Sequence, residues 1–134
     1  MTDKPSTILI VEDEPGFRRT YCDLFTHYGH NVLEAENGQI GWELAGKELP
    51  DIILLDLVMP VMTGYELLSK LHEDDSTKKI PVIIFSVLGE QTDIQKALEL
   101  GASDYIVKGF YSPQEVLGKI GKFLAKADIQ EVTD

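Results

Sequence analysis

Five short apolar runs alternate along the chain with five stretches of helical spacing, and this alternation restricts the fold more than any other feature. The runs cover residues 8–11, 31–35, 51–56, 81–86 and 104–107. The first, third and fourth are apolar on both faces, which is typical of strands that helices cover on both sides of a parallel sheet. Strand and helix in regular alternation predict an α/β fold with a doubly wound sheet.

The segments between the runs carry the boundary residues of helices. Pro15 fits the first turn of one helix and Gly29 its end, while Ser112 followed by Pro113 is a typical start for the last helix. Trp42 lies in the second helical segment, off its apolar stripe, and we expect it to be partly buried against a neighbouring helix. The apolar stripe of the first helix comprises Phe17, Tyr21, Leu24, Phe25 and Tyr28.

The chain of 134 residues is long enough for one domain and leaves no room for a second. We expect a single domain over residues 6–127, with flexible ends at 1–5 and 128–134. The apolar runs are too short to span a bilayer, and the N-terminus lacks the pattern of a secretory signal. Cys22 is the single cysteine, which excludes an internal disulfide, so we expect an inert thiol in a cytoplasmic protein.

Acidic residues outnumber basic residues by 23 to 12, which gives a formal net charge of -11. Nucleic-acid phosphates and anionic lipids would repel such a chain. The composition therefore argues against direct nucleic-acid binding and against membrane insertion. Much of this acidity only keeps a protein soluble, so the positions of the acids are more informative than their number.

Polar side chains follow the predicted strands. The first strand leads into Glu12 and Asp13, the third ends in Asp56, the fourth ends in Ser86, and the fifth leads to Lys108. Ligands of open α/β sheets bind beyond the carboxyl ends of the strands, so we expect these side chains at one edge of the sheet. Each alone has an ordinary explanation as a cap, a turn residue or a solvated lysine, and only their joint placement indicates a site.

This combination of groups predicts chemistry on a phosphoryl group. Three neighbouring carboxylates repel one another unless a cation lies among them, and an oxygen-only ligand set favours Mg²⁺. Lys108 adds a positive charge that would attract a phosphoryl group, to which Ser86 can donate a hydrogen bond. Asp56 can serve as the nucleophile that forms an aspartyl phosphate. The histidines have no ligand-like spacing, and we assign them no metal role.

The motifs around these residues carry a resemblance to a known family. They are ILIVEDE at 8–14, LLDLVMPVMTG at 54–64, VIIFS at 82–86 and GASDYIVKGF at 101–110. The acid pair, the D-x-x-M-P-x-x-x-G stretch and the lysine after the fifth strand, in this order, resemble the response-regulator receiver domains of two-component signalling over about residues 6–127. The resemblance implies a flavodoxin-like fold with five helices, in which the five-stranded parallel sheet has the order 2-1-3-4-5.

The resemblance also implies the roles of the acidic residues. Asp56 would be the phosphoacceptor, and it would receive a phosphoryl group from a histidine kinase or a histidine phosphotransfer protein. Mg²⁺ would be bound by Asp13, by Asp56 and by the main-chain carbonyl of Val58. Glu12 would act on the metal largely through water.

Three further residues would connect phosphorylation to a partner. Ser86 and Lys108 would contact the phosphoryl group, and Tyr105 would be the switch residue whose ring turns inward on activation. The face formed by the fourth helix, the fifth strand and the fifth helix would then change and bind a downstream protein. Such a domain is not an enzyme with separate substrates, although with Mg²⁺ it would assist its own phosphotransfer and dephosphorylation.

Two positions depart from the family pattern. Gly109 follows Lys108, where the family commonly has a proline after a cis peptide bond. A non-proline cis bond costs about 2.5–4 kcal/mol, so we expect either a trans bond or local strain, and we favour the trans bond. Val87 follows Ser86, where the family usually has a small residue. With Val58 and Leu88 it would narrow the entrance and prolong the life of the phosphoryl group.

Other functions are compatible with parts of the pattern. A phosphatase of the haloacid-dehalogenase type needs a second acid two residues after its nucleophile, where this chain has Val58. A flavodoxin-like FMN protein shares the fold, but Glu12 and Asp13 would repel its phosphate. A receiver that binds partners without phosphorylation remains a third possibility. A receiver domain by itself is a stand-alone regulator, a relay intermediate or a piece of a longer protein.

Overall fold

The computed structural model describes residues 5–133, with side chains to residue 125. Its single sheet has five parallel strands in the order β2-β1-β3-β4-β5, so the predicted fold is confirmed. The strands are β1 (Thr7–Val11), β2 (Asn31–Ala35), β3 (Ile52–Leu55), β4 (Val82–Ser86) and β5 (Asp104–Val107). The helices are α1 (Pro15–His27), α2 (Gly38–Glu48), α3 (Gly64–Glu73), α4 (Gln91–Glu99) and α5 (Pro113–Thr133).

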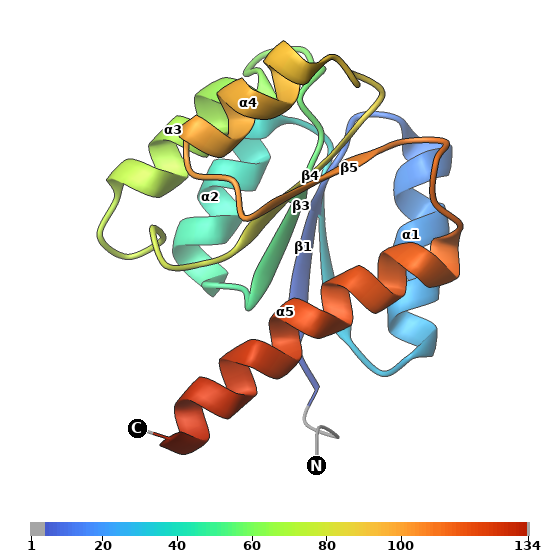
Figure 1. Ribbon diagram of the computed structural model, residues 1–134, viewed down its shortest axis with the longest axis vertical. Coiled ribbons are helices and arrows are strands. Elements are labelled where there is room, and N and C mark those ends of the chain that lie inside the picture. The colour runs from blue at the N-terminus through green and yellow to red at the C-terminus, as the bar shows by residue number, and fades with distance from the viewer. Residues whose placement is uncertain (1–4, 134) are drawn as a thin grey trace.

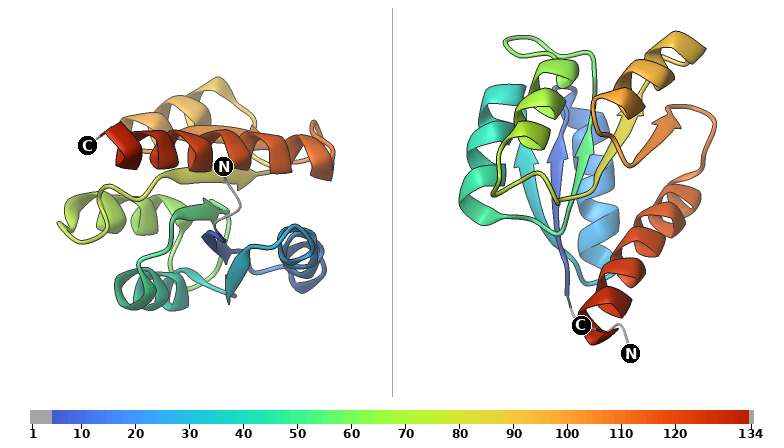
Figure 2. Two further views of the ribbon diagram at one scale, coloured as in Figure 1. Left: turned by 90° about the horizontal axis from the view of Figure 1, so that it is seen from below. Right: turned by 60° about the vertical axis from the view of Figure 1, so that its left-hand side comes forward.

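The sheet is the middle of three layers. Helices α1 and α5 cover one face, and α2, α3 and α4 lie on the other (Figures 1 and 2). Because successive side chains of a strand point to opposite faces, Ile8 and Ile10 join the core beneath α1 and α5, whereas Leu9 and Val11 join the core on the other face. This two-sided burial explains why the central strands are apolar throughout.

Two sequence expectations concern single side chains. Trp42 is half-buried against the core on the α2 and α3 face, as predicted, and Nζ of Lys70 lies 5.5 Å from the centroid of its ring. Cys22 is buried, and burial raises the pKa of its thiol, which disfavours the reactive thiolate. None of the helices in the described part of the chain is long and apolar enough to cross a membrane.

The domain boundaries stay a prediction. Residues 1–4 and 134 lie outside the described residues, and the backbone of α5 is helical as far as Thr133.

The helices differ in how firmly their first turns are fixed. The α3 helix begins with a capping box in which Thr63 and Glu66 bond each other's main-chain amides. By contrast, the N-cap of α4, Glu90, makes no side-chain capping hydrogen bond, and Ala97 is the buried residue of that helix. The hydroxyl of Tyr65 in α3 donates to Asp93 of α4 at 3.2 Å. The α4 helix is therefore held mainly by burial of Ala97 and by the hydrogen bond from Tyr65, and not by a capping side chain at its N-terminus.

Candidate functional site

Hydrogen bonds of the sheet continue beyond the strands and fix the first polar residues at its carboxyl edge. The amide of Glu12 donates to a carbonyl of β2 (3.0 Å), and the amide of Asp56 donates to a carbonyl of β1 (3.0 Å). The amide of Lys108 donates to the carbonyl of Ser86 at the end of β4 (2.8 Å). These main-chain contacts bring four of the predicted site residues to one edge of the sheet.

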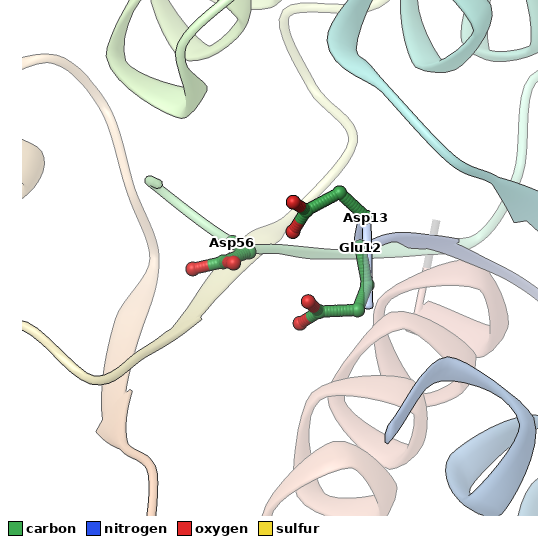
Figure 3. Close-up of side chains that lie close together, drawn as sticks. All are labelled: Glu12, Asp13 and Asp56. Atoms are coloured by element: carbon green, nitrogen blue, oxygen red, sulfur yellow. The ribbon is translucent and has the colours of Figure 1, made fainter. Parts of the chain in front are cut away.

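Glu12, Asp13 and Asp56 form a cluster of carboxylates at this edge. Each offers one oxygen, and these oxygens all lie within 4.8 Å of one another. Figure 3 shows Glu12 and Asp13 extending from the end of β1 toward Asp56. Glu12 and Asp56 are only 3% and 5% exposed, whereas Asp13 is exposed. Nearly desolvated carboxylates beside a third acid are electrostatically unfavourable unless a cation joins them.

Lys108 supplies one such cation. Its Nζ lies 2.6 Å from Oε1 of Glu12 and 3.6 Å from Oδ2 of Asp56, and its side chain is mostly buried. Burial raises the pKa of Glu12 above its ordinary value; the hydrogen bond from Lys108 lowers it in part, and the charge of Asp56 raises it further. One ammonium beside three acids leaves an excess of negative charge, which favours a further, divalent cation.

The loop between β3 and α3 holds the side chain of Asp56. The amide of Val58 donates to Oδ1 of Asp56 at 3.3 Å. Gly64, the first residue of α3, packs so tightly behind this loop that a Cβ atom there would collide with the main-chain oxygen of Asp56. Glycine at this position therefore brings the start of α3 directly against the main chain of the predicted phosphoacceptor.

Ser86 and Tyr105 meet at the loop that follows β4. Ser86 is fully buried, and its Oγ accepts a hydrogen bond from the amide of Leu88 at 3.3 Å. The hydroxyl of Tyr105 donates to the carbonyl of Leu88 at 2.5 Å, and its half-buried ring packs against the core beneath α3 and α4. Burial raises the pKa of Tyr105 to about 12. The ring thus lies inward, next to the loop that begins at Ser86.

The two departures from the family pattern have different structural meanings. The bond between Lys108 and Gly109 is trans, as we favoured, and Gly109 has a φ of 92°. Proline holds φ at about -65°, so a proline could not adopt this backbone, whereas glycine adopts it readily. Val87 and Val58 are 65% and 52% exposed near the site, and their effect on the phosphoryl lifetime stays a prediction.

Two residues outside the predicted site contact it. Nζ of Lys108 lies 4.2 Å from the centroid of the Phe17 ring. Nη1 of Arg18 donates to the main-chain carbonyl of Glu12 (2.7 Å), and its Nε donates to Glu34 (3.1 Å). In sequence, Phe17 belongs to an apolar stripe that predicts only core packing, and Arg18 belongs to no motif. Their nearness to the acid pair along the chain was the one available signal.

Comparisons with known proteins show the family that the chain resembles. The family model of the response regulator receiver domain matches residues 8–120. A probable transcriptional regulator, ycf27 of Porphyra purpurea, is 36% identical over 128 residues, which are 96% of this chain and 51% of that protein. The chain therefore spans about half the length of this relative. Protein PilH of Pseudomonas aeruginosa is 41% identical over 101 residues, which cover 75% of this chain and 84% of PilH.

A solved structure supports the same assignment. The CheY-like response regulator receiver domain protein from Methanospirillum hungatei superposes with a TM-score of 0.88 at 25% identity, over 95% of this chain and 99% of that one. A family match over most of the chain, the shared strand order and the acidic edge of the sheet lead to one conclusion. The chain belongs to the response regulator receiver domain family of two-component signalling.

Proposed function

We propose that Asp56 is the phosphoacceptor of this receiver domain. The observation that carries the proposal is the position of its nearly buried carboxylate, which has an ammonium 3.6 Å away and oxygens of two further acids within 4.8 Å. In the proposed reaction, an oxygen of Asp56 attacks the phosphorus of a phosphohistidine. The P–N bond of the donor breaks as the P–O bond forms, and the imidazole leaves.

The acidic cluster fits Mg²⁺. Its donors are all oxygens, which suit a hard divalent cation that takes one or two carboxylates and retains water. Asp13 and Asp56 would hold the ion directly, Glu12 would hold it largely through water, and the main-chain carbonyl of Val58 would complete the protein ligands. A bound Mg²⁺ would neutralise the acids and attract the phosphoryl oxygens.

Lys108 and Ser86 would receive the new charge. The phosphoryl group adds about -1.5 to -2 charge and three acceptor oxygens. Lys108 can transfer its contact from Glu12 to one of these oxygens, and Ser86 can donate its hydroxyl to another if the hydroxyl turns toward Asp56. The same groups would assist the domain's own phosphotransfer and dephosphorylation.

Movement of Ser86 would change the contacts of Tyr105, because both side chains form hydrogen bonds with the main chain of Leu88. A phosphoryl group can shift the switch only by favouring one arrangement of these contacts over the other. Tyr105 lies in β5, with α4 beside it, so the surface of α4, β5 and α5 would change with the switch. We propose this surface as the contact with a downstream protein.

The phosphoryl donor would be a histidine kinase or a histidine phosphotransfer protein. A chain with an excess of acidic residues would act through protein partners, without binding nucleic acid directly or entering a membrane. The cytoplasmic location that we expect from the sequence belongs to the same proposal.

Labelling with acetyl phosphate tests the assignment of Asp56. We expect intact mass to increase by one phosphoryl group in the presence of Mg²⁺ and to remain unchanged in EDTA. The Asp56→Asn variant should take up no label. Asp75→Asn is the matched control, because this exposed acid lies far along the chain from the site and should not affect labelling. Labelling of Asp56→Asn at the wild-type rate would refute the assignment.

The same experiment addresses a receiver that works without phosphorylation. Such a module would take up no label from acetyl phosphate with or without Mg²⁺. A hydrolase would release phosphate from added phosphomonoesters, yet the position of its general acid holds Val58, an apolar side chain that cannot donate a proton. We therefore place the phosphoacceptor ahead of both alternatives.

A further inference from the structure

The loop that follows Lys108 restrains the lysine side chain weakly. Gly109 presents no side chain, and nothing lies within 4 Å of the place where a Cβ would sit. The next residue, Phe110, is 78% exposed. A lysine side chain is a flexible four-carbon stem, so a fixed position of its ammonium needs contacts from elsewhere in the fold. The loop runs past the start of α1, where such a contact exists (Figure 1).

Phe17 provides that contact. It lies in the first turn of α1, half-buried, and the centroid of its ring is 4.2 Å from Nζ of Lys108. The ring is held in turn by two neighbours, because its centroid lies 5.1 Å from that of Tyr21 and 5.0 Å from that of Phe85. The amide of Phe17 also donates to the capping carboxylate of Glu14 at 2.6 Å. The aromatic face is therefore placed by the core and by the helix cap.

We propose that Phe17 is a positioning residue that holds the ammonium of Lys108 at the phosphorylation site. The inference rests on the proposed phosphoacceptor role of Asp56. The ammonium lies between the ring of Phe17, the carboxylate of Glu12 at 2.6 Å and the carboxylate of Asp56 at 3.6 Å. The ring attracts the cation through its electron-rich face, most strongly where water is excluded.

An aromatic face suits this task better than another acid would. A further carboxylate would add negative charge to a pocket that must admit a phosphoryl group, whereas the ring carries no net charge. The attraction to the ring also depends little on direction. Lys108 can therefore turn from Glu12 to the incoming phosphoryl oxygen without leaving the Phe17 face.

Phe17 also packs in the core, so the test must separate core packing from the positioning of Lys108. Two substitutions do this. Phe17→Leu keeps an apolar side chain but removes the aromatic face, while Phe17→Tyr keeps the face. If the face positions Lys108, Phe17→Leu should slow acetyl-phosphate labelling by about three- to tenfold and Phe17→Tyr should restore the wild-type rate. Phe25→Leu, in the same helix but without a contact to Lys108, is the matched control and should label at the wild-type rate.

A double-mutant comparison makes the test specific. Lys108→Ala should slow labelling more than Phe17→Leu does, and adding Phe17→Leu to Lys108→Ala should cause no further loss. The inference is overturned if Phe17→Leu labels at the wild-type rate, or if it slows labelling equally with and without Lys108. Labelling of Asp56→Asn would instead overturn the proposed function, so the two failures are distinguishable.

A second measurement does not depend on labelling. The ε-methylene protons of Lys108 should resonate upfield of those of the other lysines in NMR spectra of the wild-type protein, because the Nζ atom bonded to that methylene lies over the Phe17 ring, 4.2 Å from its centroid. Loss of this signal in Lys108→Arg would assign it. The upfield shift should persist in Phe17→Tyr and disappear in Phe17→Leu. An unchanged shift in Phe17→Leu would show that the ring does not hold the lysine.

Discussion

The hydroxyl of Tyr105 donates a 2.5 Å hydrogen bond to the main-chain carbonyl of Leu88, so the predicted switch residue is tied to the loop that follows Ser86. Tyr105→Phe keeps the ring and removes this bond. We expect the free energy of unfolding to fall by about 1 kcal/mol, because the Leu88 carbonyl loses its partner. Denaturant unfolding with matched m-values measures the change, and an unchanged midpoint would contradict it.

The same substitution has a signature at high pH. The pKa of Tyr105 is raised to about 12 by burial, above the model-peptide value of about 10. Because the folded state holds this proton more tightly, its stabilising contribution is complete below the unfolded pKa and is lost as the pH rises through the folded pKa. Alkaline titration followed by tyrosinate absorbance should show a late step in the wild type that is missing in Tyr105→Phe.

Val87→Ala tests whether the entrance to the site controls the phosphoryl lifetime. The Val87 side chain follows Ser86 directly and is 65% exposed, where it can exclude water from the aspartyl phosphate. We expect the half-life of the phosphorylated protein to shorten in Val87→Ala. Loss of label after removal of acetyl phosphate gives the half-life. Leu49→Ala, at an exposed apolar residue that follows α2, is the control, and an equal effect of both substitutions would refute the explanation.

Val61 is strained in the loop between Asp56 and α3. Its φ of 73° is unfavourable for a β-branched side chain, and the residue is 80% exposed, so little burial offsets the strain. Val61→Gly should raise the free energy of unfolding by about 1 kcal/mol, the strain relieved less the entropy that glycine adds to the unfolded chain. Val58→Gly should instead lower the free energy of unfolding, because φ of Val58 is not positive and glycine there only adds entropy to the unfolded chain. Thermal unfolding of both variants decides between these outcomes.

The sequence predicted the fold correctly because two-sided apolar runs and their alternation with helices leave few other arrangements. It also placed Glu12, Asp13, Asp56 and Lys108 at one edge, since the ends of parallel strands meet there. It could not find the contact between Phe17 and Lys108. That contact joins residues that are distant in the chain. The apolar stripe of the first helix also explains Phe17 fully as a core residue.

Backbone conformation was also beyond the sequence. The sequence shows that Gly109 departs from the family pattern, but the positive φ of this residue depends on the path of the loop in space. The positive φ of Val61 could not be predicted from its residue type, because valine usually indicates extended structure. The backbone conformation at such positions is determined by where the connected strands and helices begin and end. The intrinsic preference of the residue has less influence there.

His30 should make the free energy of unfolding decrease at mildly acidic pH. Its Nδ1 is buried without a hydrogen-bond partner among the described residues, and burial lowers the pKa of the ring below the usual value. The unfolded chain therefore binds this proton more readily, so the stability that His30 contributes is present above the unfolded pKa and is lost as the pH falls through the folded pKa.

Substitution isolates this effect. We expect the denaturant midpoint of the wild type to fall more between neutral and mildly acidic pH than that of His30→Asn. His27→Asn, at an exposed position of α1, serves as the control and should follow the wild type. Equal slopes for wild type and His30→Asn would exclude the contribution of His30.

The weak attachment of α4 has a consequence for the energy of signalling. Only Ala97 of this helix is fully buried, and its first turn lacks a side-chain cap, so shifting α4 disturbs few contacts. A small local free-energy difference can then separate two positions of the helix, while the capped α3 and the apolar sheet remain unchanged. A single phosphoryl group supplies only a few kcal/mol of differential interaction. If the proposed switch acts on α4, this amount suffices, because reorganising a weakly attached helix costs little free energy.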